Sequence, residues 1–358
     1  MIAMKLPQYT IGEGVLEHIG DECKEYGEKA LIISGERALE KTKITIEDSL
    51  KKAGLQIADF LWYGGECSYK NIAMLKEKTE GQQIDMIIGV GGGKALDTAK
   101  AVGEKAGIPT ITVPTISSTC AATTMISVVY EDSGDFNSIY CLDEPPVHIL
   151  IDTEIIAKAP SKYLWAGIGD TIAKYYEVEA TTRGKKLPHS IVMGKSLSPM
   201  CVNSLVKYGA KALEDNNKGT SSFELQETIL NIIITTGFVS TLVGEIYNGA
   251  CAHGLFNALT SLEQIEKNHL HGEVVSYGVL VMLMMDDQYG EIDRLIPFYK
   301  EIGLPTSLKD IGVANTREYL DPVLEKAVHM DDVAKMPYKV TKNMFFEAIE
   351  KLENLKIK

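Results

Sequence analysis

A run of three glycines, Gly91–Gly93, follows the apolar segment Ile87–Val90 and precedes a helical pattern that begins near Lys94. Glycines let the backbone approach a ligand closely, and the free N–H groups at the start of a helix attract phosphate. The segment is not a P-loop, which would need glycine at Ile88 and serine or threonine at Ala95. It is not Gly-x-Gly-x-x-Gly either, because that motif would end here on Lys94. A tight turn without a ligand does not require three glycines, so we predict a pyrophosphate cradle.

Asp170, His253 and His271 could together bind a metal ion. Asp170 lies in a helical pattern, His253 in a helical stretch of small residues, and His271 at an apparent helix start. One carboxylate and two imidazoles suit a divalent ion such as Zn²⁺ or Fe²⁺ and leave a coordination position for a substrate. Intervals of 83 and 18 residues form no metal motif, however, and a histidine beside glycine is commonly a packing or capping residue. Spacing alone leaves both interpretations open.

The first 150 residues predict the framework that would hold the glycine run. Short apolar runs rich in β-branched residues alternate there with helical patterns at 36–54 and 68–81. Such alternation predicts a parallel sheet covered on both faces, which binds ligands at the carboxyl ends of its strands. The glycine run stands at such an end. The predicted strands are Ala30–Ser34, Gln56–Trp62, Asp85–Val90, Thr110–Thr115 and His148–Asp152.

From Lys162 onward the sequence consists of long amphipathic helical segments without a convincing strand. The change near Pro160 predicts two domains. We expect a Rossmann-like α/β nucleotide-binding domain over residues 1–158 and an all-helical metal and substrate domain over residues 159–358.

Composition and charge exclude several partners. The chain has 358 residues, 45% of them hydrophobic and 24% charged, as expected of a globular protein large enough for two domains. A net charge of −13 without a lysine or arginine cluster argues against nucleic acid. The most apolar stretch, Ser276–Met285, is shorter than the roughly 20 residues of a membrane span. We therefore expect a small-molecule substrate, and neither a nucleic acid nor a membrane as partner.

The cysteines and the N-terminus predict the compartment. The six cysteines are scattered, and none forms a Cys-x-x-Cys pair, so neither a disulfide framework nor a zinc–thiolate site is expected. The N-terminus lacks the basic and apolar regions of a signal peptide. Both observations predict a reduced, cytoplasmic protein.

Five ordered segments resemble the iron-containing (group III) alcohol dehydrogenases, and the resemblance extends over nearly the whole chain. The chain is most similar to the glycerol dehydrogenase branch. The resemblance implies a nucleotide-binding α/β domain before a helical metal domain, and assembly into a homo-oligomer. It also implies hydride transfer between NAD(H) or NADP(H) and a small alcohol or carbonyl substrate. The segments are GVGGGKALDTAK (89–100), VPTISSTCAATTMISVVY (113–130), GIGDTIAKYYE (167–177), AHGLFNALT (252–260) and HGEVVSYG (271–278).

The resemblance further implies roles for particular residues. The metal ligands would be Asp170, His253 and His271. The pyrophosphate would lie against Gly91, Gly92, Gly93, Lys94 and Asp97. The nicotinamide half would be flanked by Thr115, Ser118, Thr124, Ile126 and Tyr130.

Lys174 departs from the pattern of many iron-type members, which have a fourth ligand, a histidine, at this position. Glycerol dehydrogenases also lack that histidine, so we expect a three-ligand site for one divalent ion, zinc, with iron or manganese as alternatives. Lys174 lies four residues after Asp170 and therefore on the same helix face. It is either a substrate-binding residue or a solvated lysine.

Cys120 stands in the loop where glycerol dehydrogenases carry an aspartate near the polyol. A thiol is a poor substitute for a carboxylate that accepts hydrogen bonds from vicinal hydroxyls. The loss of this anion and the cation of Lys174 favour a carboxylate-bearing substrate, as in the hydroxycarboxylate dehydrogenases. We predict catalytic roles for both residues and a short 2-hydroxy acid or 2-oxo acid as substrate. The alternatives are a glycerol dehydrogenase that uses NAD and, less favoured, a dehydroquinate synthase-type lyase.

Gly35 follows the first predicted strand at the position where glycerol dehydrogenases have an aspartate. An acidic residue there accepts hydrogen bonds from the adenosine ribose and repels the 2′-phosphate of NADP. Its absence, together with Arg37 as a partner for that phosphate, predicts that NADP(H) is used at least as well as NAD(H). Glu36 is the counter-argument, because a one-residue shift would restore the acidic contact.

Overall fold

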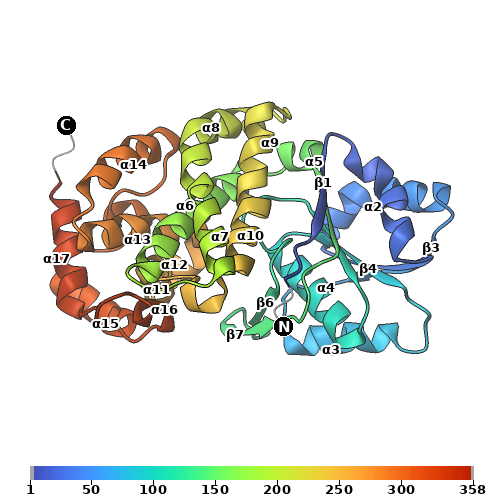
Figure 1. Ribbon diagram of the computed structural model, residues 1–358, viewed down its shortest axis with the longest axis horizontal. Helices are drawn as coiled ribbons and strands as arrows, with labels where there is room; N and C mark the ends of the chain where they lie inside the picture. The colour runs from blue at the N-terminus through green and yellow to red at the C-terminus, as the bar shows by residue number, and fades with distance from the viewer. Residues whose placement is uncertain (1–3, 356–358) are drawn as a thin grey trace. The chain divides into compact units, whose positions relative to one another are not determined.

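The computed structural model describes residues 4–355, so residues 1–3 of the first predicted domain and 356–358 of the second lie outside the described residues. The chain divides into two compact units, which can be followed by colour in Figure 1. One contains the chain up to Pro160 and Asp215–Ile229; the other contains Ser161–Glu214 and the chain from Leu230 onward. The sequence predicts a single border, between residues 158 and 159, and does not indicate that 215–229 belongs with the first unit.

A six-stranded sheet in which every pairing is parallel forms the centre of the first unit. All five predicted strands belong to it, with limits within one residue of the prediction, so the predicted Rossmann-like sheet is confirmed. Across the sheet the strands are β1 (Gln8–Gly12), β8 (His148–Asp152), β5 (Thr110–Pro114), β4 (Met86–Gly91), β2 (Lys29–Ser34) and β3 (Gln56–Trp62).

Both faces of this sheet are covered, because its buried strands place successive apolar side chains on opposite sides. Ile32 and Ile88 join a core with the first two helices, and Leu31 and Ile87 join a second core with the third and fourth. The predicted helices 36–54 and 68–81 are confirmed as α2 and α3. The four helices are α1 (Ile19–Cys23), α2 (Glu36–Lys52), α3 (Tyr69–Thr79) and α4 (Gly93–Ala106).

Three short strands were missed by the sequence analysis. β1 is an edge strand of the sheet, and its first residues are exposed. β6 (Ile126–Tyr130) and β7 (Phe136–Cys141) form a separate antiparallel pair; only Ser127 and Val129 of β6 are buried, and β7 is largely exposed. β1 and β7 lack the continuous apolar run that marks a strand buried on both faces.

Hydrogen bonds explain why residues 215–229 belong to the first unit. The side-chain amide of Asn216 donates to the carbonyl oxygens of Ile156 and Ala157, both at 2.9 Å. These carbonyls belong to the last turn of α5 (Thr153–Ala157); that of Ile156 also accepts the main-chain N–H of Ala159 at 3.0 Å. Asn216 therefore caps the C-terminal end of α5.

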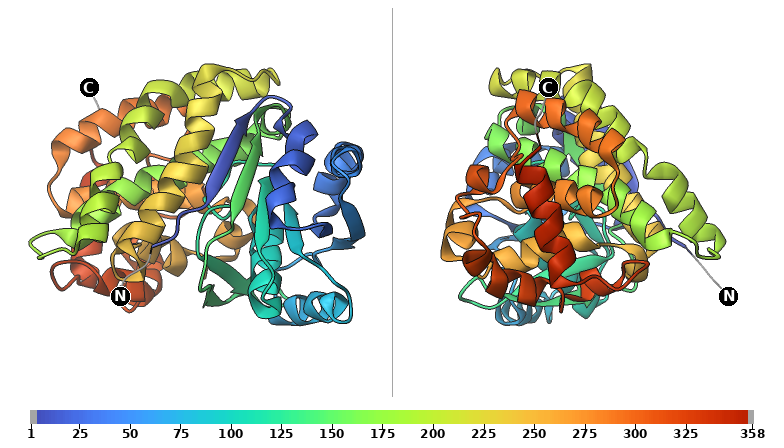
Figure 2. Two further views of the ribbon diagram at one scale, coloured as in Figure 1. Left: turned by 45° about the vertical axis from the view of Figure 1, so that its right-hand side comes forward. Right: turned by 90° about the vertical axis from the view of Figure 1, so that its left-hand side faces the viewer.

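The second unit is helical, and its described residues contain no strand, as predicted. α13 lies at its centre: its side chains from Val274 to Met284 are buried, and it packs against α6, α11, α14 and α17. Figure 2 shows α17 in red. The helices are α6 (Ser161–Thr182), α7 (His189–Leu197), α8 (Met200–Asn217), α10 (Thr236–Val243), α11 (Cys251–Leu259), α12 (Glu263–Asn268), α13 (His271–Met285), α14 (Tyr289–Ile302), α15 (Arg317–Ala327), α16 (Asp331–Ala334) and α17 (Lys342–Glu353).

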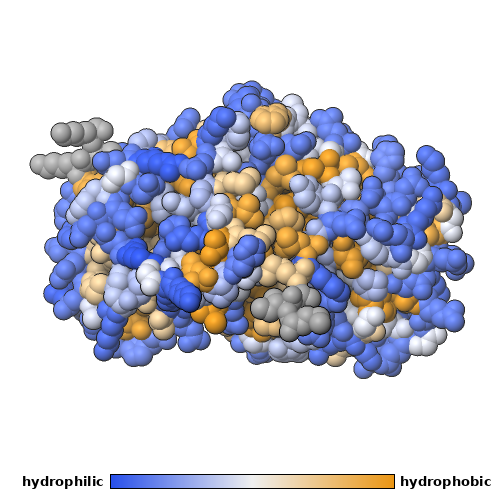
Figure 3. All heavy atoms as spheres, viewed as in Figure 1, coloured by the Kyte–Doolittle hydropathy of each residue, from blue (hydrophilic) through white to orange (hydrophobic). Residues whose placement is uncertain are grey.

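One described stretch, Phe223–Val243, is long and apolar enough to cross a membrane on length and composition alone. It comprises α9 (Phe223–Leu230), the π-helical turn Asn231–Thr235 and α10. The protein buries 67% of its most apolar window, as expected of a core helix in a globular protein. On the face drawn in Figure 3, hydrophobic side chains are interspersed among hydrophilic ones.

Candidate metal and cofactor sites

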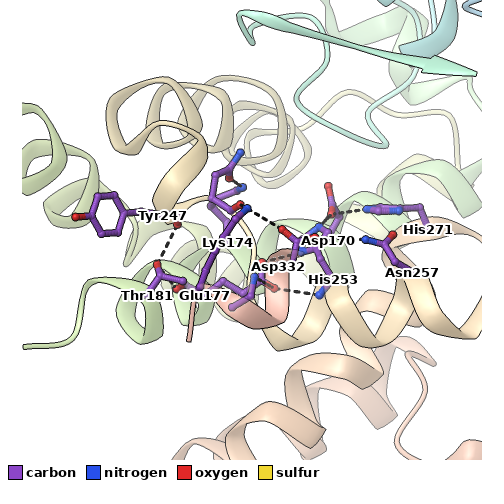
Figure 4. A network of polar contacts seen from close by, with 12 residues as sticks. Asp170, Lys174, Glu177, Thr181, Tyr247, His253, Asn257, His271 and Asp332 are labelled. Carbon is purple, nitrogen blue, oxygen red and sulfur yellow. Dashed lines mark hydrogen bonds and ion pairs between the residues drawn. The ribbon is translucent and has the colours of Figure 1, made fainter. Parts of the chain in front are cut away.

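Four polar side chains lie in a row along one face of α6. Asp170, Lys174, Glu177 and Thr181 follow one another at intervals of four, three and four residues, and such intervals share a helix face. Figure 4 shows this row beside the side chains of His253 and His271. α6 therefore presents a carboxylate to both histidines that the sequence analysis singled out.

The three predicted metal ligands meet in space. Nε2 of His253 lies 3.3 Å from Oδ1 of Asp170, and Nε2 of His271 lies 3.2 Å from the same oxygen. One potential ligand atom from each residue lies within 4.8 Å of the others. The side chain of Asp170 is 12% exposed, whereas that of His271 is 42% exposed, so the cluster can be reached from the His271 side.

Glycines hold the helices close enough for this geometry. A Cβ on Gly272, the second residue of α13, would lie 1.9 Å from the carbonyl oxygen of Ala166 on α6. A Cβ on Gly169 would lie 2.3 Å from the carbonyl oxygen of Gly272. Farther along α13, a Cβ on Gly278 would lie 2.6 Å from the carbonyl oxygen of Ala252 on α11. Main-chain contacts, rather than intervening side chains, thus set the spacing of the three helices.

Glu177 is a buried carboxylate bonded to one of the metal-ligand candidates. Its Oε2 lies 2.7 Å from Nδ1 of His253, and its Oε1 accepts the main-chain N–H groups of Ala250 at 2.7 Å and of His253 at 3.0 Å. Its side chain is 0% exposed. Glu177 therefore fixes both the ring of His253 and the first turn of α11.

The electrostatics of the cluster fit a divalent cation. Burial alone would lower the pKa of His253, but the carboxylates of Glu177 and Asp170 raise it to about 10. Burial would raise the pKa values of both acids, yet their histidine partners hold the pKa of Asp170 well below its usual range and lower that of Glu177. Two buried carboxylates thus stay ionised beside the imidazole rings, and a divalent ion that replaced the ring protons would neutralise them.

Lys174 lies in the same row on α6 but already has a partner. Its side chain is buried, and its ammonium donates to the amide oxygen of Asn248. It is therefore not a solvated surface lysine. A substrate carboxylate would have to compete with Asn248 for it.

The glycine run forms a strand-to-helix turn at the carboxyl end of β4, as predicted. Gly91 has φ +148°, which favours glycine, and a Cβ on Gly92 would lie 2.8 Å from Ile116. A Cβ on Gly93 would meet only ordinary contacts, the nearest at 3.5 Å, so packing does not require glycine there. Gly92 is the N-cap of α4, and no side chain caps this end. The first-turn N–H groups and the space at Gly93 fit a phosphate.

Two predicted pyrophosphate residues have protein partners. Nζ of Lys94 lies 2.5 Å from Oε1 of Glu66 and 4.9 Å from the centre of the Tyr130 ring. The side chain of Asp97 is buried and lies 2.8 Å from Nζ of Lys100. Asp97 therefore stabilises the fold beneath the glycine run, and its role at the pyrophosphate stays a prediction.

The predicted nicotinamide residues lie next to the glycine run. Thr115, Ser118 and Cys120 occupy the loop after β5; the N–H of Thr115 donates to the carbonyl oxygen of Gly91 at 3.0 Å. Cys120 is partly exposed and forms no disulfide. Ile126 and Tyr130 are the two ends of β6, and Thr124 precedes it.

The end of this loop is fixed by a buried lysine, Lys100. Its Nζ donates to the carbonyl oxygen of Thr124 at 3.1 Å and to that of Ile126 at 2.5 Å, while it also pairs with Asp97. The hydroxyl of Thr124 lies 3.3 Å from the same Nζ. Thr124 therefore bonds inside the fold, and Lys100 fixes where the loop joins β6.

Gly35 lies beside the glycine run, where the adenosine half of a dinucleotide would follow. It is the N-cap of α2, and a Cβ placed on Gly91 would be 3.7 Å from its nitrogen. Glu36 and Arg37 are both exposed in the first turn of α2. The predicted specificity residues thus lie beside the glycine run, with an acid and a base next to each other.

The chain is similar to known dehydrogenases in sequence and in structure. Residues 7–153 match the model of the family described as iron-containing alcohol dehydrogenase. A glycerol dehydrogenase from Thermotoga maritima is 33% identical, over 95% of this chain and 93% of the relative. The hydroxycarboxylate dehydrogenase A of Escherichia coli is 32% identical, over 97% and 96%. The solved glycerol dehydrogenase of Schizosaccharomyces pombe superposes with a TM-score of 0.88 at 28% identity, over 99% of this chain and 90% of that one.

The chain belongs to the iron-containing alcohol dehydrogenase family. It is an NAD-dependent alcohol dehydrogenase of the glycerol dehydrogenase branch, and the predicted oxidoreductase class is confirmed. The dehydrogenase class also sets aside the lyase alternative.

Sequence analysis missed three residues of this alcohol dehydrogenase that contact predicted site residues. Glu177 lies seven residues after Asp170, a spacing that places both on one helix face and was a usable signal. Lys100 lies three residues after Asp97, which was a similar signal. Glu66 comes from the segment between β3 and α3, and no spacing relates it to Lys94.

Proposed function

We propose that this alcohol dehydrogenase interconverts a short 2-hydroxy acid and the matching 2-oxo acid at a divalent ion held by Asp170, His253 and His271. The observation that supports a metal-dependent reaction is the meeting of these three side chains on three helices, backed by the buried carboxylate of Glu177. A bound divalent ion supplies a Lewis acid that stabilises negative charge on a substrate oxygen.

The chain's own residues would bind and orient the reactants. Gly91, Gly93 and the first-turn N–H groups of α4 would hold the pyrophosphate of the nicotinamide cofactor, which carries the hydride. Lys100 fixes the end of the loop expected to flank the nicotinamide. Because His271 is the most exposed of the three ligand candidates, substrate would reach the site from its side.

Cys120 supports the 2-oxo acid as substrate. Glycerol dehydrogenases carry a carboxylate near the polyol at the position of Cys120, and a thiol lacks the negative charge with which a carboxylate would repel an acidic substrate. The similarity to hydroxycarboxylate dehydrogenase A supports the same class.

Glycerol is a second candidate with equal support. The ammonium of Lys174 already donates to the amide oxygen of Asn248, so Lys174 has a partner other than a substrate carboxylate. Several relatives, including that from Thermotoga maritima, are named glycerol dehydrogenases.

An activity panel with glycerol, 1,2-diols, 2-oxobutyrate and other short 2-oxo acids decides between them. We expect the highest kcat/KM with a 2-oxo acid. In the Lys174→Ala variant, we expect KM for 2-oxo acids to rise far more than KM for neutral ketones. Better turnover of glycerol than of any 2-oxo acid overturns the proposal and favours the second candidate.

The choice of cofactor and metal is part of the proposal. Gly35 and the exposed Arg37 support use of NADP(H) at least as well as NAD(H), although Glu36 lies between them. Measuring kcat/KM for both cofactors with one substrate tests this, and a tenfold preference for NADH, about 1.4 kcal/mol, overturns it. Two histidines and one carboxylate support zinc; elemental analysis of the purified enzyme tests zinc against iron and manganese.

We further propose a homo-oligomer in the reduced cytoplasm, without a nucleic acid or membrane partner. The net charge of −13 supports the absence of a nucleic acid partner, and the absence of disulfides among the described cysteines supports a reduced compartment; the oligomer is proposed from the family resemblance alone. Sedimentation of the purified enzyme measures its oligomeric state, and a monomer at micromolar concentration contradicts that part.

A further inference from the structure

Glu177 links α6 to the start of α11, the helix that carries His253. The N-cap of α11 is Ala250, which has no side-chain acceptor for the free N–H groups of the first turn. Glu177, on α6, provides this acceptor: its Oε1 accepts hydrogen bonds from the main-chain N–H groups of Ala250 and His253. A carboxylate at this end is also favoured by the helix dipole.

The second oxygen of Glu177 determines how the imidazole is protonated. Since Oε1 already accepts two main-chain N–H groups, Oε2 is the atom that faces Nδ1 of His253, at 2.7 Å. An ionised carboxylate accepts hydrogen bonds and cannot donate them, so Nδ1 carries the proton. A metal ion in place of the second ring proton would then bind Nε2, which lies 3.3 Å from Oδ1 of Asp170.

We infer that Glu177 is a positioning residue that holds His253 as an Nδ1-protonated ring, directs its Nε2 to the metal and thereby sets metal affinity. This inference rests on the proposed function, because it requires a metal at Asp170, His253 and His271. A carboxylate behind a ligating histidine fixes its orientation and raises its basicity, and its loss typically weakens metal binding about 10- to 100-fold.

The Glu177→Gln variant separates this role from simple packing. Glutamine keeps the shape but has one acceptor oxygen and one NH₂ donor. If its oxygen faces the two main-chain N–H groups, its NH₂ faces Nδ1, and the ring proton must move to Nε2, the proposed metal-binding atom. If the amide turns over, the NH₂ opposes the N–H groups of Ala250 and His253. Either arrangement weakens the zinc site.

Glu353→Gln is the matched control. Oε1 of Glu353 also accepts one main-chain N–H, from Leu308 at 2.8 Å, and one side-chain donor, the hydroxyl of Tyr277 at 3.0 Å. Tyr277 lies six residues after His271 on α13, so this pair belongs to the same unit but contacts no ligand candidate. The control measures how much zinc affinity changes when an acid becomes an amide without a histidine partner.

Zinc affinity is measured by competition with a chromophoric chelator on folded, metal-stripped protein. We expect wild type and Glu353→Gln to agree within about threefold and Glu177→Gln to bind zinc about 10- to 100-fold more weakly. If wild type binds zinc and Glu177→Gln binds it equally well, the inference fails while the proposed function stands. If wild type itself binds no zinc, the proposed function fails first and the inference with it.

A spectroscopic measurement on the wild-type enzyme does not depend on the folding of Glu177→Gln. The ¹⁵N shifts of the zinc-loaded protein report which ring nitrogen of each histidine carries the proton, and loss of one signal set in His253→Asn identifies His253. We expect a proton on Nδ1 and zinc on Nε2. A proton on Nε2, or zinc on Nδ1, overturns the inference even if Glu177→Gln does not fold.

Discussion

Replacing Gly272 by alanine tests whether the main-chain contact between α6 and α13 sets the geometry of the metal ligands. The new Cβ would stand 1.9 Å from the carbonyl oxygen of Ala166 and 2.9 Å from Cβ of Asp170, whereas real Cβ contacts essentially never fall below 3.0 Å. The start of α13 must therefore move away from α6 by about 1 Å. His271 immediately precedes Gly272, so its Nε2, now 3.2 Å from Oδ1 of Asp170, moves too.

The expected losses follow from that shift. Overpacking of a close contact typically costs about 1–3 kcal/mol, which should appear in the free energy of unfolding. Metal–ligand distances tolerate changes of only about 0.2 Å, and a misplacement of about 1 Å costs about 100-fold in turnover. We therefore expect the zinc affinity of Gly272→Ala to fall by at least about tenfold.

Gly290→Ala is the control for adding a methyl group to a helix. Gly290 is the second residue of α14, and a Cβ there would meet nothing within 4 Å. Urea unfolding and chelator competition on both variants separate stability from ligand geometry. If Gly272→Ala binds zinc as tightly as Gly290→Ala does, the helix contact does not set the ligand spacing, and the reasoning is wrong.

Three further predictions concern the first unit. Burial lowers the pKa of His148 below 6.5 and outweighs the acids near it, so as the pH falls His148 is protonated in the unfolded chain before it is protonated in the folded one. As the pH falls below about 6.5, the free energy of unfolding should therefore decrease more steeply in wild type than in His148→Asn, and equal decreases between pH 7.5 and 5.5 contradict this. Lys100→Met leaves the buried carboxylate of Asp97 without its cation, so urea unfolding should show a loss of about 3–5 kcal/mol; a loss below about 1 kcal/mol would mean that the pair is not needed. Glu66→Gln removes the ion pair of Lys94, which is partly exposed and worth about 0.2–1 kcal/mol, and leaves Lys94 able to bind the cofactor. NADH should then bind up to about fivefold more tightly in a fluorescence titration, and weaker binding would show that Glu66 orients Lys94.

The parallel sheet could be predicted from sequence because its strands are buried on both faces. Strands such as Met86–Gly91 are read from a continuous apolar run, and the glycine run marks where the strand ends. β1 could not be recognised in the same way, because an edge strand with exposed residues carries no such run.

The metal cluster could not be predicted from spacing. Asp170, His253 and His271 belong to three helices, and contacts such as Gly272 against Ala166 bring them together. Such contacts depend on tertiary packing, which no interval along the chain reveals. The residue types suggested the three residues and the resemblance to a family favoured them as ligands, but only the structure shows that Asp97 points inward.

The contribution of residues 215–229 to the first unit affects how the protein folds during synthesis. The chain up to Pro160 is synthesised first, yet the side-chain amide of Asn216, which bonds to the carbonyl groups of Ile156 and Ala157, is made only later. The nascent N-terminal unit therefore waits for the segment that ends at Ile229 before its contacts are complete. A fragment stopped at Pro160 would leave those carbonyls without Asn216, so a stand-alone nucleotide-binding module should carry 215–229 joined to it through a designed linker.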